Sequence, residues 1–331
     1  MRYDQNDRES TNVEDRRGED TGGGGFPFPG GRGGIQIPIG GGGFSLTSML
    51  IIGAIMLLFG INPLDILMGG GGGGGGGPIN MPQLPRAERP VAQRTPVNIP
   101  GLPGSRPAAG QAQGPANEDQ MKSFVSKVLA DTEDVWTGVF KGFGQQYTDP
   151  PLVLFSDYTR TACGAGQAQM GPFYCPLDQK VYIDLNFYDE MKRKFNINGD
   201  FAQAYVVAHE VGHHVQKLLG IADKVMELKD RSDEVTQNKI QVRMELQADC
   251  LAGVWANLND QMKQRLQPGD IEEALNAATQ IGDDMIQKKM TGRVIPDAFT
   301  HGTAAQRVRW FKAGLESGRM ENCDTFNTSS L

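Results

Sequence analysis

The sequence has few of the residues that several functional classes require. It contains no long run of Lys or Arg, and its formal net charge is -7 over 331 residues. Because binding to nucleic acid needs clustered basic side chains that contact phosphates, no nucleic-acid partner is expected. Only four cysteines are present, and no two of them form a Cys-x-x-Cys pair. A structural zinc site made of cysteines is therefore disfavoured.

Two of the four cysteines flank a short loop. Cys163 and Cys175 enclose a segment that contains several Gly and Pro residues, and a disulfide between them would contribute roughly 3 kcal/mol in the chain-entropy model. Such a bond persists only in an oxidising compartment. Cys250 lies in a helical pattern, where an unpaired cysteine is usually buried. The sequence leaves open whether Cys250 pairs with Cys323.

Glycine and proline are abundant but very unevenly distributed. Of the 44 glycines and 19 prolines, most fall before position 116, where a packed core is not expected. The remaining chain is long enough for one globular domain. The predicted organisation is a disordered Gly-rich tail at 1–43, an apolar segment at 44–62, a Gly/Pro-rich linker at 63–116, a folded domain at 117–325 and a disordered tail at 326–331.

The apolar segment is long enough to cross a bilayer. From Phe44 to Ile61 it has no charged residue, and as a helix it would span about 27 Å against a hydrocarbon core of about 30 Å. A cleaved signal peptide and a buried core helix are the alternatives. Both are disfavoured, because a long polar stretch precedes the segment and glycine tracts flank it. We therefore expect one transmembrane helix that anchors the chain in the lipid bilayer.

The distribution of basic residues predicts the orientation of this helix. Several arginines precede the apolar segment, whereas the next basic residue after it is Arg86. The positive-inside rule then places the N-terminus in the cytoplasm and the folded domain on the periplasmic or extracytoplasmic side of the cell membrane. That side would also permit the disulfide. The arginines counted are Arg2, Arg8, Arg16, Arg17 and Arg32.

Hydrophobic periodicity predicts a mostly helical α+β domain with a small sheet. Apolar residues follow helical spacing from Met121 to Phe140, and strand patterns occupy 152–155 and 180–185. After residue 199 the pattern is helical almost to the end. Asp200 and Gln203 predict a variant capping box at the start of one helix, and Gly220 suits its end.

That helix carries an H-E-x-x-H motif, formed by His209, Glu210 and His213. Residues four apart on a helix point the same way, so both imidazoles can reach one tetrahedral Zn²⁺ ion. Glu210 is turned about 100° from His209, beside the ion, where a general base belongs.

A catalytic zinc site also needs a third protein ligand. The extended motif H-E-x-x-H-x-x-G-x-x-H is excluded, because Gln216 and Leu219 occupy the required Gly and His positions. In the segment Met244-Glu-Leu-Gln-Ala-Asp-Cys250, Glu245 and Asp249 share one helical face. We interpret Glu245 as the third ligand and Asp249 as a hydrogen-bond acceptor for a ring N–H, most plausibly that of His209. The alternative is that both acids only solvate a helix surface.

Several motifs together resemble a known family. The segments HEVGHH, ELQADC, CGAGQAQMGPFYCPLDQKVYIDLNFYDE and THGTAAQR are similar to those of the bacterial putative neutral zinc metallopeptidase family. The resemblance covers the apolar segment and nearly all of 117–323. It implies a zincin-like fold of the glutamate-zincin type and peptidase activity. In that fold the strand before the active helix pairs with extended substrate, a role that the resemblance assigns to Val181, Tyr182 and Ile183.

Two further histidines need an interpretation. His301 is the only histidine outside the active helix, and related zincins use a distant His or Tyr to stabilise the oxyanion of the tetrahedral intermediate. We treat it as a candidate catalytic residue, with a structural role as the alternative. His214 points off the ligand face and is interpreted as structural. Thr303 and Gln306 predict another helix start.

The function expected from the sequence is zinc-dependent hydrolysis of peptide bonds in a peptide or protein substrate. Zn²⁺ would lower the pKa of a bound water, and Glu210 would take its proton and deliver it to the leaving amine. The alternatives are a tethered zinc-binding module without hydrolytic activity and a cell-wall amidase with the same metal chemistry.

Overall fold

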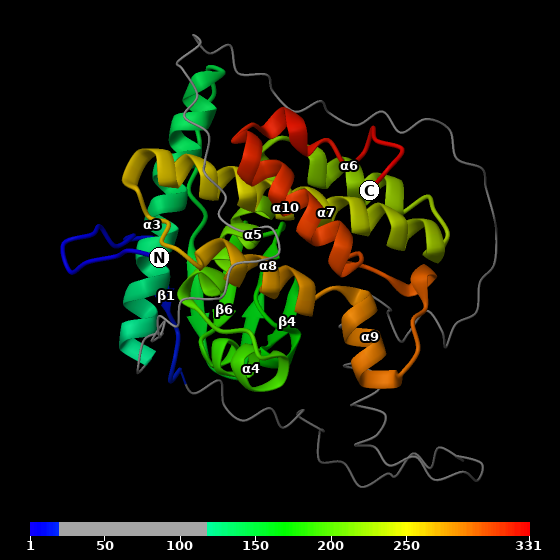
Figure 1. Ribbon diagram of the computed structural model, residues 1–331, viewed down its shortest axis with the longest axis horizontal. Coiled ribbons are helices and arrows are strands. Elements are labelled where there is room, and N and C mark those ends of the chain that lie inside the picture. The colour runs from blue at the N-terminus through cyan, green and yellow to red at the C-terminus, as the bar shows by residue number, and fades with distance from the viewer. Residues whose placement is uncertain (20–117) are drawn as a thin grey trace, which may run out of the picture.

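The computed structural model describes residues 1–19 and 118–331 (Figure 1). Helices predominate and two small sheets accompany them, which confirms the predicted α+β class. The predicted transmembrane helix at 44–62 and the linker at 63–116 lie outside the described residues. None of the helices in the described ranges is long and apolar enough to cross a membrane.

Eight α-helices lie in the described part of the chain after residue 117, joined by short connections and three short 3₁₀ helices. Most of their buried apolar side chains belong to one large core cluster. The helices are α3 (Glu118–Gly142), α4 (Asn186–Phe195), α5 (Asp200–Leu218), α6 (Ile221–Lys229), α7 (Glu234–Lys263), α8 (Asp270–Gln280), α9 (Asp283–Thr291) and α10 (Ala304–Ser317). The 3₁₀ helices are η1 (Ala168–Met170), η2 (Pro296–Ala298) and η3 (Met320–Cys323).

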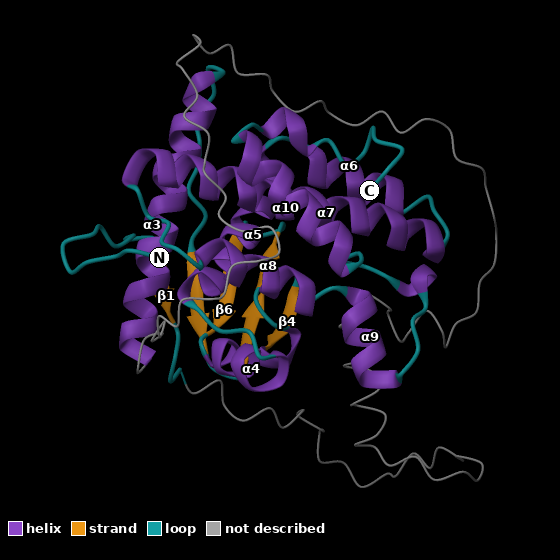
Figure 2. Ribbon diagram, in the orientation of Figure 1, coloured by secondary structure: helices purple, strands orange, loops and turns teal. Residues whose placement is uncertain are grey.

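The main sheet has four strands in the order β1-β2-β6-β5. Strands β1, β2 and β6 are parallel, and β5 is antiparallel to β6. In Figure 2 the strands lie together below helices α5, α7 and α10. A separate hairpin is formed by β3 and β4. The strands are β1 (Val13–Asp15), β2 (Leu152–Phe155), β3 (Tyr158–Thr161), β4 (Gly164–Gln167), β5 (Phe173–Cys175) and β6 (Lys180–Asp184).

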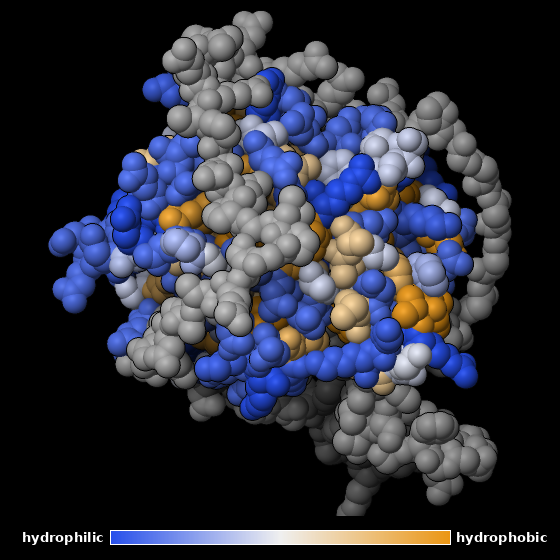
Figure 3. Space-filling view, in the orientation of Figure 1, coloured by the Kyte–Doolittle hydropathy of each residue, from blue (hydrophilic) through white to orange (hydrophobic). Residues whose placement is uncertain are grey.

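Both faces of the sheet are covered. Side chains that alternate along β2 and β6 explain this, since successive residues of a strand point to opposite faces. Leu154 and Ile183 belong to the large core shared with the helices, whereas Val153, Phe155 and Tyr182 form a second, smaller cluster. The outer surface seen in Figure 3 is mostly hydrophilic, with hydrophobic side chains in scattered groups.

The prediction that residues 1–43 are disordered is wrong for residues 1–19. Val13–Asp15 forms β1, which pairs in register with Leu152–Leu154 of β2. The segment also forms ion pairs with α3, among them Arg8 with Glu133 at 2.7 Å. Sequence periodicity missed this order because polar contacts to distant residues hold the segment, and these leave no local pattern.

The prediction of a disordered tail at 326–331 is also wrong. Phe326 is buried, and Leu331 packs against the core while its carbonyl oxygen accepts a hydrogen bond from Arg309. The carbonyl of Thr328 accepts a hydrogen bond from Arg243 of α7. The tail is therefore part of the domain surface over α7 and α10.

Helices α7 and α10 pack with their backbones almost in contact. A Cβ atom on Gly314 would lie 1.9 Å from the carbonyl oxygen of Cys250, and one on Gly253 would lie 2.1 Å from that of Phe311. Only glycine permits this approach at both positions. Cys250 forms a disulfide with Cys323, which answers the question that the sequence left open.

Helix α5 does not begin as predicted. Its N-cap is Gly199, no side chain caps it locally, and the amide oxygen of Gln203 has no hydrogen-bond partner among the described residues. Instead Glu273 of α8 accepts the backbone N–H of Phe201 at 3.1 Å. A residue from another helix therefore accepts one of the N–H groups at the start of α5. The predicted start of α10 is confirmed, because Thr303 and Gln306 form a capping box.

Candidate metal centre

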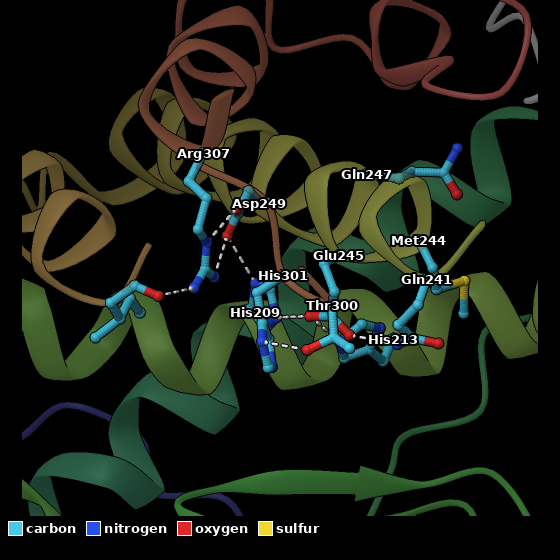
Figure 4. A network of polar contacts seen from close by, with 12 residues as sticks. His209, His213, Gln241, Met244, Glu245, Gln247, Asp249, Thr300, His301 and Arg307 are labelled. Atoms are coloured by element: carbon cyan, nitrogen blue, oxygen red, sulfur yellow. Dashed lines mark hydrogen bonds and ion pairs between the residues drawn. The ribbon is translucent and has the colours of Figure 1, made fainter. Parts of the chain in front are cut away.

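Three predicted ligands converge where α5 packs on α7 (Figure 4). His209, His213 and Glu245 each offer a ligand atom, and these atoms lie within 4.8 Å of one another. Oε2 of Glu245 is 3.1 Å from Nε2 of His209 and 3.3 Å from Nε2 of His213. The residues that sequence spacing indicated are thus brought to one point, although Glu245 lies 32 positions after His213 in the chain.

The outer hydrogen bonds of the two imidazoles leave the inner nitrogens free to bind a metal. Nδ1 of His209 lies 2.9 Å from Oδ1 of Asp249, and Nδ1 of His213 lies 2.8 Å from Oε1 of Gln216. Both oxygens only accept, so each Nδ1 carries the hydrogen, and in the neutral ring Nε2 then has a lone pair. Two such nitrogens and one carboxylate fit a Zn²⁺ ion that keeps a fourth position open.

A glycine in the motif lets the two helices approach. Gly212 lies between the two histidines, and a Cβ atom there would be 3.1 Å from the carbonyl oxygen of Ala248. That distance is tighter than an ordinary contact, so a larger residue would push α5 and α7 apart. Gly212 and Ala248 therefore help to bring Glu245 within reach of the imidazoles.

The charges at the site are strongly coupled. Burial alone would lower the pKa of His209, but Asp249 and Glu245 outweigh it and raise that pKa to about 10. Burial would raise the pKa of Glu245, yet His213 and His209 hold it well below its usual range. Metal binding at the imidazoles would release their protons, because the ligand form is neutral.

Asp249 joins the site to a buried arginine. Its carboxylate accepts hydrogen bonds from Tyr205, from His209 and from two guanidinium nitrogens of Arg307, the latter both at 2.8 Å. Arg307 also donates to the Tyr205 hydroxyl at 3.1 Å and to the carbonyl of Ile281. The predicted role of Asp249 as an acceptor for His209 fits this geometry.

Sequence reasoning missed Arg307 as a functional residue. It is the last residue of the THGTAAQR segment that carried the resemblance, which was a signal for it. Arg307 lies at the end of the first turn of α10 and is buried, with 3% of its surface exposed. A buried arginine needs a carboxylate partner, and an acid at an otherwise buried helix position such as Asp249 could have suggested the pair.

Glu210 is the acid beside the ligands that has no fixed partner. It is buried with 8% of its surface exposed, and its carboxylate forms no hydrogen bond or ion pair with any described residue. Burial raises its pKa, an effect that nearby His209 and His213 oppose. A carboxylate held close to the ligands but left unbonded is available to a water molecule or a substrate group.

Tyr188 of α4 is a second unpaired polar group beside Glu210. Its hydroxyl is buried and has no hydrogen-bond partner within the described residues. Burial raises its pKa, and the charge of Glu210 raises it further. The two groups are therefore close enough to interact electrostatically.

His301 lies at the same site, and Asp283 fixes its position. Its Nδ1 is 3.2 Å from Oδ1 of Asp283, and the backbone N–H groups of Thr300, His301 and Gly302 all donate to Oδ2 of that acid. Its side chain is 40% exposed. Desolvation would lower the pKa of His301, but Asp283 and the charge of Glu245 outweigh it and raise that pKa. Figure 4 shows His301 beside His209 and Glu245.

The predicted substrate strand is in the wrong place. Val181, Tyr182 and Ile183 belong to β6, which lies inside the sheet, where β2 pairs with it on one side and β5 on the other. The backbone of Val181 and Tyr182 is therefore already paired. The edge of the sheet next to β6 is β5, a strand of three residues that the sequence pattern did not reveal.

Two other predictions are confirmed. Cys163 and Cys175 form a disulfide with a Cα–Cα distance of 5.8 Å. His214 points away from the ligands: its Nε2 lies 2.7 Å from the carbonyl of Thr148 and its Nδ1 3.0 Å from the Tyr174 hydroxyl. Both ring nitrogens are thus occupied, and the residue is structural.

Two imidazoles one turn apart, a carboxylate from a later helix and an unbonded acid beside them define a metal centre of the type that zinc peptidases use. The chain belongs to the putative neutral zinc metallopeptidase family, whose sequence pattern matches residues 97–326.

Relatives with similar sequences occur in Escherichia coli and Mycobacterium bovis. The uncharacterized protein YpfJ of Escherichia coli strain K12 is 46% identical over 333 residues, which cover 99% of this chain and 100% of that protein. The uncharacterized protein Mb2605 of Mycobacterium bovis is 43% identical over 209 residues, which cover 60% of this chain and 68% of that protein. No solved structure matches the chain significantly.

Proposed function

We propose that the protein is a zinc-dependent endopeptidase. One observation carries the proposal: Nε2 of His209, Nε2 of His213 and Oε2 of Glu245 meet at one point, and Glu210 stands beside them without a hydrogen-bond partner among the described residues. A structural zinc site is closed by four protein ligands, whereas three ligands leave a position for chemistry. The described residues offer no fourth His or Cys in this group.

Each residue has a distinct role in the proposed reaction. Zinc held by His209, His213 and Glu245 would lower the pKa of a water molecule and polarise the scissile carbonyl. Glu210 accepts the proton of the attacking water and then donates it to the leaving amine, which its raised pKa favours. Nε2 of His301 donates a hydrogen bond to the oxygen that gains negative charge at the carbonyl.

Asp249 and Asp283 act on the histidines and not on the substrate. Asp249 orients His209 through Nδ1, and Asp283 orients His301 in the same way. Each acid is almost fully buried and makes several other hydrogen bonds, so its position is well determined. Such partners preserve ligand orientation and basicity.

The proposed substrate is a peptide or protein in extended conformation. Strand β5 lies at the edge of the sheet and contacts α5, so an extended chain could add to it as a further strand. This moves the substrate strand from β6 to Phe173–Cys175. Main-chain pairing of this kind recognises a peptide backbone with little regard for its sequence.

The test compares Glu210→Gln with Glu227→Gln in the full chain, each loaded with zinc and offered a peptide library. Glu227 lies on the exposed side of α6, so its substitution is the matched control. Glu210→Gln should keep zinc and lose at least 100-fold in hydrolysis, as loss of a general base predicts. Equal cleavage by both variants would refute the assignment, and a parent that binds zinc without cleaving any peptide would favour a binding module.

A further inference from the structure

Residues 1–19 are built into the zinc domain by contacts with α3 and the sheet. In Figure 1 this segment, at the blue end of the colour scale, lies against α3 and β1 joins the strands. The main chain of Asn12 accepts a hydrogen bond from Leu152, and that of Leu154 accepts one from Arg16. These bonds flank the three paired residues of β1, so the segment completes the edge of the sheet beside β2.

A buried acid of α3 depends on this segment. Glu133 is 5% exposed, and its carboxylate accepts hydrogen bonds from Arg8 at 2.7 Å, from Asn12 at 2.9 Å and from the Ser10 hydroxyl. All three donors belong to residues 1–19. Without them a buried carboxylate would lose every described partner, which is costly.

A second anchor lies nearer the start of the chain. The Tyr3 hydroxyl donates to Asp131 of α3 at 3.0 Å, and the guanidinium of Arg265 lies over the Tyr3 ring at 4.4 Å from its centroid. Arg265 itself pairs with Asp131 at 2.9 Å and with Asp7 at 2.8 Å. The segment is therefore held at both ends by groups that are complementary in charge.

We propose that residues 1–19 and the zinc domain lie on the same side of the membrane, so that the apolar segment at 44–61 does not carry the chain across it. An 18-residue apolar helix is long enough for one crossing and too short for two. One crossing would put β1 and β2 on opposite sides of the bilayer. Strands that pair in one sheet must share a side.

The arginines that predicted the opposite orientation have other partners. Arg8 pairs with Glu133 and Asp134, Arg16 pairs with Glu14, and the main chain of Arg2 bonds to that of Arg265. The charge of Arg8 is paired within the folded domain, so its position before the apolar segment does not by itself indicate a cytoplasmic N-terminus. This replaces the expectation of a cytoplasmic N-terminus with a domain outside.

The two disulfides indicate which side is shared. Bonds of this kind persist in oxidising compartments, and the domain contains two of them, Cys163–Cys175 and Cys250–Cys323. Residues 1–19 then also lie on the outer side. The described residues contain no free cysteine, which makes the topology easy to probe.

The test uses two variants of the full chain that each add one cysteine to the four native ones, Gln5→Cys and Glu316→Cys, in intact bacterial cells. Both positions are exposed, one in the first segment and one on α10. A membrane-impermeant maleimide should label both to a similar extent, with no more than a small gain after detergent treatment. Equal protection of both would place them inside but still on one side, and would also support the proposal. Labelling of one position with protection of the other until lysis would overturn it.

A second measurement asks whether the segment docks in the full chain. Arg8→Ala removes the cation next to Glu133, whereas Arg193→Ala removes the partner of Glu190 in an exposed pair on α4. In thermal unfolding of the purified full chain, Arg8→Ala should lower the Tm by several degrees and Arg193→Ala should leave it unchanged. Equal Tm values for these two variants would mean that residues 1–19 do not dock, and the proposal would fail. Zinc content and peptidase activity are separate readouts, so failure here leaves the proposed function standing.

Discussion

The ion pair between Asp249 and Arg307 should dominate the stability of the centre. Arg307 contacts both carboxylate oxygens at 2.8 Å, and the two side chains are 4% and 0% exposed. Removing one member of such a pair leaves the other charge buried, which costs about 3–5 kcal/mol. Asp249→Asn and Arg307→Met should therefore each lower the free energy of unfolding by about that amount.

The double variant should be more stable than the sum of the single effects predicts. When both charges are gone, neither desolvation penalty remains, and a coupling energy of about 1–3 kcal/mol is expected. The assay is urea unfolding of zinc-free protein with both disulfides intact, followed by circular dichroism. The exposed pair of Lys224 and Glu227, 3.0 Å apart on α6, is the matched control, with coupling below about 1 kcal/mol.

Zinc affinity, measured in the same variants, distinguishes the orienting effect of Asp249 on His209 from its effect on the free energy of unfolding. Asp249→Asn takes the carboxylate acceptor from Nδ1 of His209 and should weaken zinc binding by roughly 10- to 100-fold. Arg307→Met leaves that acceptor in place and should weaken zinc binding less. Additive losses of unfolding free energy, within about 0.5 kcal/mol, would refute the account of a buried pair. Equal zinc affinities for the two single variants would refute the orienting role of Asp249.

Two further predictions concern packing and pH. Gly314→Ala should lower the free energy of unfolding by about 1–3 kcal/mol, because the added Cβ would lie 1.9 Å from the carbonyl oxygen of Cys250. An unchanged urea midpoint would contradict the close packing of α7 and α10. Burial and the charge of Asp200 raise the pKa of Glu273 from 4.5 to about 7, so the folded state holds this proton more tightly and stability falls as pH rises between those values. Glu273→Gln should flatten that part of the stability–pH curve and raise stability at pH 8 by on the order of 1 kcal/mol, after allowance for solvent screening. A curve of unchanged slope would show that the carboxylate is not the source.

The local parts of the fold were predictable because their causes are local. Helical spacing located α5, alternation located β6, and a capping box located the start of α10 at Thr303. The start of α5 was not predictable in the same way. Its N-terminal backbone is satisfied by Glu273, which lies more than 70 residues further along the chain.

In the candidate site, too, some features have local causes in the sequence and others depend on distant residues. Spacing alone put His209 and His213 on one helical face and made Glu245 a reasonable third ligand. Helical or strand spacing does not reveal the roles of Arg307 and Asp283, because these roles depend on charges that α7 and the loop before α10 bring to them. The interior position of β6 likewise depends on a pairing with β5 that sequence alternation does not specify.

What the sequence determined by itself is the donor chemistry: two imidazoles on one helical face, an acid turned to the side of them on the same helix, a carboxylate on another helix, and cysteines able to bridge. These follow from residue identity and from the fixed period of the helix. The tertiary structure decided which carboxylate faces which ring, which strands form the edges of the sheet, and that residues 1–19 belong to the domain. Such contacts join residues far apart in the chain, and they are selected by which surfaces and charges are buried together, a property that no short stretch of sequence contains.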